Sequence, residues 1–146
     1  MKDYIYIIVP FMTVILAQAI KFTIESIRDK KLRWGRLFNG NGGMPSSHTS
    51  FTFSLAFTIG YLQGFNSPIF AVVLVFSIIV AYDAMGLRME SSKHAVMLNR
   101  ITEELFEGDT KEGFKLLKEQ LGHKPMEVLM GIVLGIITST IMINIL

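Results

Sequence analysis

The sequence contains no cysteine, so a disulfide framework, a thiolate metal site and a cysteine nucleophile are all excluded. It is also poor in charge, because only 18% of its 146 residues are Asp, Glu, Lys or Arg, whereas 51% are hydrophobic. A soluble domain typically has about 25% charged residues. The composition therefore indicates a membrane protein.

Four apolar stretches approach the length that a helix needs to cross a bilayer, which is about 20 residues. They cover about residues 4–20, 48–65, 69–85 and 126–146. Together they leave too little polar surface to enclose the core of a soluble helical bundle. The sequence therefore predicts an all-α fold, in which residues 1–146 form a single integral membrane domain, a polytopic bundle of about four transmembrane helices.

The positive residues are distributed unevenly between these stretches. Of the 14 Lys and Arg residues, one precedes the first stretch, six lie between the first and second, none between the second and third, and seven between the third and fourth. With four spans the two basic connections lie on one side, which the positive-inside rule places in the cytoplasm. We therefore expect a multi-pass protein of the cell membrane with its functional site on the cytoplasmic face.

The two basic connections differ in character. Residues 39–45 are rich in glycine and asparagine, and such a backbone can approach a ligand closely. Between residues 90 and 121, apolar residues recur at helical spacing among charged ones: Ala95, Leu98, Ile101 and Leu105. This pattern predicts two cytoplasmic amphipathic helices, one that ends at Gly108 and one over about 112–121, which lie on the membrane surface or cap the bundle.

Two of the three histidines stand where predicted helices begin on the cytoplasmic side. His48 follows Ser46 and Ser47 at the start of the second stretch, and His123 precedes Glu127 at the start of the fourth. Helix N-termini present N–H groups and a partial positive charge, which suit an anion such as phosphate. For the Pro-Ser-Ser-His run alone, N-capping serines and an interfacial histidine are an equally good interpretation.

Basic residues near the same end favour the anion-binding interpretation. Lys21 and Arg28 follow the first stretch with six residues between them, and Arg88 follows the third. Converging cations, helix N-termini and two imidazoles suit phosphoryl transfer, which needs charge neutralisation, a nucleophile and an acid. Asp83 is the only acid within the first three predicted spans, and we favour a structural pairing with a nearby cation for it, or support of a catalytic histidine.

The order of these residues resembles the three-part signature of the type 2 phosphatidic acid phosphatase and vanadium haloperoxidase superfamily. The sequence has Lys-x6-Arg from Lys21, Pro-Ser-Ser-His at 45–48 and His-x3-Glu from His123. The finer resemblance is to the divergent small-membrane-protein branch, the acid phosphatase/haloperoxidase-related proteins. It is carried by the strings Gly-Met-Pro-Ser-Ser-His-Thr at 43–49, Asp-Ala-Met-Gly-Leu-Arg at 83–88, Leu-Asn at 98–99 and Leu-Gly-His-Lys-Pro-Met-Glu-Val at 121–128.

The resemblance implies a phosphatase that works without a metal or cofactor. His123 would attack phosphorus to form a phosphohistidine, Glu127 would orient its ring, and His48 would protonate the leaving oxygen. The phosphate oxygens would be held by Lys21, Arg28, Arg88, Ser46 and Ser47. The substrate would be a phosphate ester or anhydride on an amphiphile, such as phosphatidate, phosphatidylglycerophosphate or a prenyl phosphate.

The sequence departs from the parent signature at four positions. Three of them replace Pro, Gly and Asp of the parent with Asp29, Ser47 and Glu127. The fourth is Leu117, which stands six residues before His123, where the parent has an arginine that would clamp the transferred phosphoryl group. Our hypothesis is that Arg88 substitutes for this arginine.

Other function classes stay open. The missing arginine favours a non-catalytic lipid-binding or lipid-transport module, both histidines favour an enzyme, and a structural subunit would need neither histidine. Membrane lipids are the expected partners, whereas topology already explains the basic connections without nucleic acid, and three scattered histidines do not predict a metal site. Gly131 and Gly135 form a small-x3-small step that would pack helices or support a homodimer.

Overall fold

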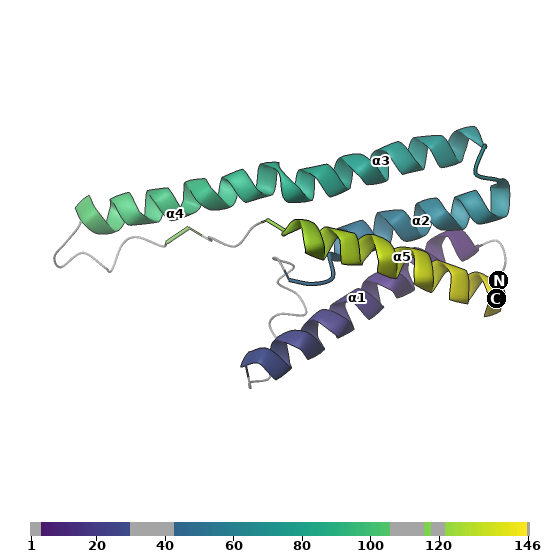
Figure 1. The fold of residues 1–146 in the computed structure, drawn as a ribbon, viewed down its shortest axis with the longest axis horizontal. Helices are drawn as coiled ribbons and strands as arrows, with labels where there is room; N and C mark the ends of the chain where they lie inside the picture. Colours follow the sequence, from purple (N-terminus) through teal and green to yellow (C-terminus); the bar gives the residue numbers. More distant parts are fainter. Residues whose placement is uncertain (1–3, 30–42, 106–115, 118–121, 146) are drawn as a thin grey trace.

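The computed structural model describes residues 4–29, 43–105, 116–117 and 122–145. In this part of the chain there are five α-helices and no strand: α1 Ile5–Asp29, α2 Ser47–Gln63, α3 Pro68–Met85, α4 Leu87–Leu105 and α5 Pro125–Ile145. The predicted all-α fold is confirmed. Helices α1, α2, α3 and α5 form a bundle, and α4 continues from α3 beyond it (Figure 1).

Helix α2 is the central element of the bundle, since it packs against α1, α3 and α5. The backbone N–H of Ser46 donates to the carbonyl of Glu127 at 2.9 Å, so the N-termini of α2 and α5 meet. Helix α3 runs antiparallel to α2 after a short turn. The starts of α2 and α5 therefore lie at one end of the bundle with the end of α3, while the start of α1 and the end of α5 lie at the other (Figure 1).

Three helical runs among the described residues are long and apolar enough to cross a membrane. They are Ile5–Arg28, Pro68–Thr102, which joins α3 to α4, and Pro125–Ile145. Helix α2 is shorter, with 17 residues, and carries six Ser or Thr residues. That makes three candidate spans rather than the expected four. The crossing of α2 stays a prediction, which its position among the three other bundle helices supports.

The close approach of α2 and α5 depends on glycine. A Cβ on Gly131 would lie 2.7 Å from the carbonyl oxygen of Ser46, and one on Gly135 would lie 2.8 Å from that of Ser50. Side chains at these positions would force the two backbones apart. The small-x3-small step of the sequence therefore packs α5 against α2 of the same chain.

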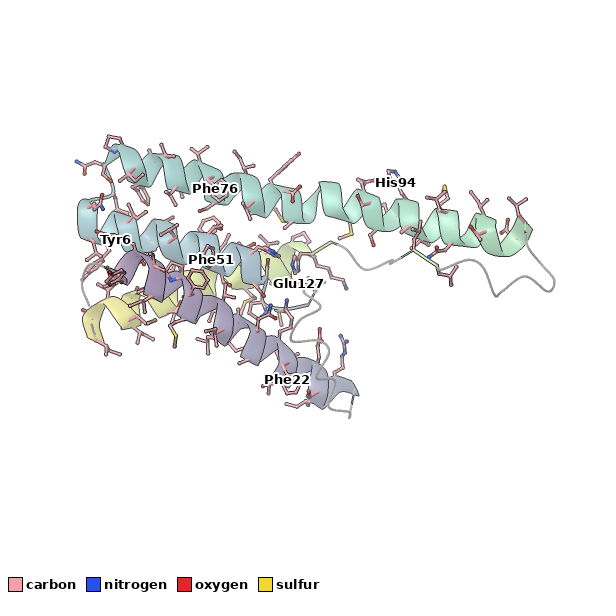
Figure 2. The ribbon with its side chains drawn as sticks, turned by 180° about the vertical axis from the view of Figure 1, so that it is seen from behind. Tyr6, Phe22, Phe51, Phe76, His94 and Glu127 are labelled. Atoms are coloured by element: carbon pink, nitrogen blue, oxygen red, sulfur yellow. The ribbon has the colours of Figure 1, made fainter. Side chains whose placement is uncertain are left out.

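Small hydroxyl side chains line the interior of the bundle, and large apolar ones face outwards. Ser139 donates to the carbonyl of Ser54 at 3.0 Å, and the hydroxyls of Thr13 and Thr138 share a hydrogen bond of 2.8 Å. Phe76 on α3 (Figure 2), by contrast, is 55% exposed. Small polar residues at helix contacts and large apolar residues on the outer surface are the arrangement expected in lipid.

Helix α4 does not cover the end of the bundle. It continues along the direction of α3 past Gly86 and projects away from the other helices (Figure 1). Ala95 is buried, but three residues predicted to share its apolar face are exposed: Leu98, Ile101 and Leu105. Gly108 and most of the helix predicted over 112–121 lie outside the described residues, and the two described positions, Leu116 and Leu117, are not helical.

Candidate active site at the junction of α2, α3 and α5

The candidate site lies where the starts of α2 and α5 meet the end of α3. Two backbone hydrogen bonds hold this junction together. The N–H of His123 donates to the carbonyl of Ala84 on α3 at 3.0 Å, and the N–H of Ser46 donates to the carbonyl of Glu127 at 2.9 Å. Figure 2 shows Glu127 at this junction, at the start of α5. The residues before α5 are therefore fixed between α2 and α3.

The buried His123 is paired with Glu127, whose side chain is 18% exposed. The His123 residue is only 2% exposed, and its Nδ1 lies 2.9 Å from Oε2 of Glu127. When the Glu127 carboxylate is ionised it only accepts hydrogen bonds, and a neutral His123 ring paired with it then carries its proton on Nδ1 and its lone pair on Nε2. In that tautomer Nε2 is the nitrogen that could act as a nucleophile.

The start of α5 explains how a histidine outside the helix reaches Glu127. Pro125 takes the first helical position, where its missing N–H has no cost. Glu127, in the first turn, reaches back to accept the backbone N–H of Lys124 at 3.2 Å, as in a capping box. The same oxygen atom therefore caps the helix and orients the ring of His123, which precedes the helix by two residues.

Lys21 contributes a buried cation from α1. It is 5% exposed, and its Nζ donates to Oγ of Ser47 at 3.3 Å. Gly43 packs on its aliphatic chain, since a Cβ there would lie 3.3 Å from Cδ of Lys21 and 2.8 Å from Oε1 of Glu25. The φ of Gly43, +87°, is one that favours glycine. Sequence reasoning missed Glu25, although its position one helical turn after Lys21 is a usable signal.

The first turn of α2 lacks a side-chain cap from its N-cap residue. Ser46 is fully buried, and its hydroxyl shares a hydrogen bond of 3.0 Å with Oγ1 of Thr49. It makes no capping hydrogen bond. The interpretation of both serines as simple N-caps is therefore wrong for Ser46. Ser47, beside Lys21, is buried as well, so two hydroxyl groups accompany the partial positive charge of this helix terminus.

His48 and Arg28 are placed differently from the buried residues. His48 is exposed in the first turn of α2, at the same end of the bundle. Arg28 is exposed near the end of α1, in the part of the helix that diverges from α2 and α5 (Figure 1). Hydrogen bonds link Lys21 to Ser47, and Glu127 to both Ser46 and His123. Because Ser46 and Ser47 are neighbours in the chain, these five predicted site residues form one cluster.

The remaining candidates lie on α3 and α4. Asp83 is half-buried in the last turn of α3, next to Ala84, whose carbonyl holds the backbone of His123. Arg88 lies in the first turn of α4 with its side chain outside the described part of the structure, so its role as a substitute arginine stays a prediction. His94 is exposed on α4, far from Glu127 (Figure 2). The described residues hold no group of three His, Asp or Glu side chains that would bind a metal ion.

A family model described as the Divergent PAP2 family matches residues 3–138, nearly the whole chain. The chain belongs to the Divergent PAP2 family. A curated relative from Bacillus subtilis (strain 168), named "Uncharacterized membrane protein YuiD", is 34% identical over 139 residues, which cover 88% of this chain and 87% of the relative. No solved structure matches the chain. Membership of the Divergent PAP2 family confirms the resemblance found in the motifs and makes the chain a PAP2-related membrane protein.

Proposed function

We propose that the protein is a membrane phosphatase that hydrolyses a phosphate ester or anhydride of a lipid through a phosphohistidine, without a metal. The observation that carries this proposal is the contact of the buried His123 with the partly buried Glu127, with 2.9 Å between Nδ1 and Oε2. This contact fixes the tautomer and stabilises the positive charge that the ring acquires when it becomes bonded to phosphorus.

The reaction would proceed in two steps. In the first, Nε2 of His123 attacks phosphorus, the bond to the leaving oxygen breaks, and His48 gives that oxygen a proton. In the second, water attacks the phosphohistidine, His48 takes a proton from the water, and inorganic phosphate leaves. His48 is exposed at the bundle end, which allows it to exchange protons with solvent between turnovers.

The phosphate oxygens would be held by groups from α1 and α2. Lys21 and Ser47 are joined by a hydrogen bond of 3.3 Å and are both buried, and the N-terminus of α2 adds its partial positive charge. Electrostatic stabilisation is stronger where water is excluded. Arg28 and Arg88 would add charge from the periphery. The site would lie on the cytoplasmic face of the cell membrane, at the depth of lipid headgroups.

The test is phosphate release by purified protein from phosphatidate, phosphatidylglycerophosphate and prenyl phosphates. We expect His123→Ala and His48→Ala to abolish release and to keep the unfolding transition of the wild type. His94→Ala is the matched control, because His94 is exposed on α4 away from the site. Wild-type release that is no higher than that of the two site variants would contradict the proposal.

A second candidate is a lipid-binding or lipid-transport module that keeps the anion site. The observations that favour it are Leu117 in place of the clamping arginine and the near-complete burial of His123. This candidate predicts that transfer of lipid phosphates between vesicles survives His123→Ala but is lost in Lys21→Gln. The enzyme predicts no such transfer, loss of phosphate release in His123→Ala and a higher KM for the lipid phosphate in Lys21→Gln.

A further inference from the structure

Asn99 on α4 makes a paired contact that neither the fold nor the proposed chemistry accounts for. Its Nδ2 donates to the carbonyl of Leu117 at 2.8 Å, and its Oδ1 accepts the N–H of Leu117, also at 2.8 Å. Asn99 is only 6% exposed. One carboxamide thus satisfies both backbone groups of a single residue 18 positions later in the chain.

The residue held by Asn99 occupies a notable position in the sequence. Leu117 stands six residues before His123, where the parent signature has its arginine. Leu117 is 50% exposed, and Asn99 contacts its backbone. His123 itself is held by the carbonyl of Ala84 at 3.0 Å. The chain is therefore attached to α4 at Leu117 and to α3 at His123.

Helices α3 and α4 form one continuous rod (Figure 1). The attachment of Leu117 to α4 and that of His123 to α3 are therefore made to the same rigid element. Backbone hydrogen bonds cross the junction, because the N–H of Gly86 donates to Tyr82 and the N–H of Glu90 donates to Gly86. Among the helices, α4 packs only against α3. Loss of the Asn99 contact would therefore release Leu117 from α4 and leave the packing of α1, α2, α3 and α5 in place.

We propose that Asn99 is a positioning residue, which sets the location of the His123 ring by anchoring the chain that leads to it. The inference rests on the proposed function, because its consequence is read as a rate at His123. The groups that bind phosphate, Lys21 and Ser47, belong to α1 and α2 and do not depend on this anchor. Removal of the anchor should therefore lower kcat and leave KM within about twofold.

Two substitutions separate anchoring from general stability. Asn99→Leu removes both hydrogen bonds at every pH. Asn99→Asp introduces a carboxyl that, when ionised, accepts the N–H of Leu117 but repels its carbonyl; when protonated, its O–H donates to that carbonyl and both bonds return. Divided by the wild-type value at the same pH, kcat of Asn99→Asp should rise about tenfold as the pH falls through the pKa of the new carboxyl.

For Asn99→Leu, kcat divided by the wild-type value at the same pH should stay low and should not change with pH. Arg100→Leu is the matched control, because the Arg100 side chain is adjacent in sequence but 80% exposed, and it should keep wild-type kcat throughout. A flat ratio for Asn99→Asp, or wild-type kcat in Asn99→Leu, would overturn the proposal.

A measurement without enzymatic activity distinguishes failure of this proposal from failure of the proposed function. The chain has no cysteine, so spin labels can be placed at Lys93→Cys and Leu116→Cys, both exposed positions. We expect a narrow distance distribution that broadens when Asn99→Leu is added. If the wild type released no phosphate, a broadened distribution would still support the anchor, and an unchanged one would overturn it.

Discussion

At the residue scale, Glu127 combines a structural role with a chemical one. Its Oε2 accepts from the backbone N–H of Lys124 and from Nδ1 of His123. Glutamine serves the capping role about as well as glutamate. Only the glutamate supplies a negative charge to the imidazolium of a phosphohistidine. Substitution therefore separates the two roles.

We predict that Glu127→Gln keeps the unfolding midpoint of the wild type and lowers the rate of phosphate release at least about tenfold, the value expected for a lost charge-assisted hydrogen bond. Initial rates and unfolding in detergent measure the two effects. Glu90→Gln, on the exposed ion pair with Lys93, is the control and should keep its rate. An unchanged rate in Glu127→Gln would exclude the charge from the mechanism.

Lys21 offers a second test at this scale. Lys21→Gln removes the positive charge but keeps a donor for Oγ of Ser47, so the junction of α1 and α2 is expected to persist. We predict that KM for a lipid phosphate rises about tenfold, since the charge on a hydrogen bond to an anion contributes about that much. Lys124→Gln, whose side chain is exposed, should leave KM unchanged. Equal KM values in the two variants would place the anion elsewhere.

The sequence predicted which residues lie together at this junction better than it predicted their contacts. The pairing of His123 with Glu127 followed from the family resemblance and is present in the structure. Asn99 had a place in the motif but no role, because its partner is the backbone of Leu117. No pattern of side-chain types marks a backbone partner, so only the three-dimensional structure reveals the contact.

At the element scale, the contact between α2 and α5 sets the geometry of the site. Gly131 lies against the carbonyl of Ser46, and the N–H of Ser46 bonds to Glu127. Any displacement of α5 at Gly131 is therefore transmitted to the residue that orients His123. A substitution that disturbs the packing of α5 against α2 should therefore also lower the rate of phosphate release.

We predict that Gly131→Ala destabilises the protein by about 1–3 kcal/mol, the usual cost of overpacking, and also lowers phosphate release. Gly60→Ala is the matched control: its Cβ would meet the rings of Phe65 and Phe70, at the opposite end of the bundle. That variant should lose stability without a loss of rate per folded molecule. Full phosphate release by Gly131→Ala would show that the contact between α2 and α5 does not control the geometry of the site.

The positions of the helices in the sequence were predicted well from hydropathy, but their packing and direction in space were not. The second stretch was expected over 48–65 and forms Ser47–Gln63, ending at Gly64, whose φ is +94°. Average hydropathy does not reveal that the hydroxyl groups of α2 face inward. Nor does it reveal the direction of α4, because Gly86 keeps helical hydrogen bonds on both sides and the rod continues.

At the scale of the whole molecule, the two ends of the bundle differ in chemistry. Aromatic rings gather at the turn between α2 and α3, where the centroid of Phe65 lies 5.8 Å from that of Phe57 and 5.2 Å from that of Phe70. Aromatic residues are enriched at membrane interfaces. The other end carries the site and adjoins the basic connections, which the positive-inside rule assigns to the cytoplasm.

Sidedness is testable because the chain has no cysteine. We predict that a membrane-impermeant thiol reagent labels Asn66→Cys in intact cells and labels Lys93→Cys only after permeabilisation. Both positions are exposed. Asn66 precedes the start of α3, and Lys93 lies beyond its end, on α4. The reverse labelling would place the site on the outer face, with the chemistry of the junction unchanged.

The most direct measurement of the central claim is the capture of phosphate on His123. Purified protein is mixed with a radiolabelled lipid phosphate and quenched in alkaline detergent, and the labelled peptide is identified by mass spectrometry. We predict acid-labile label on His123 in the wild type, less in Glu127→Gln and none in His123→Ala. Phosphate release by the wild type without label on His123, or with label on another residue, would contradict the proposed mechanism.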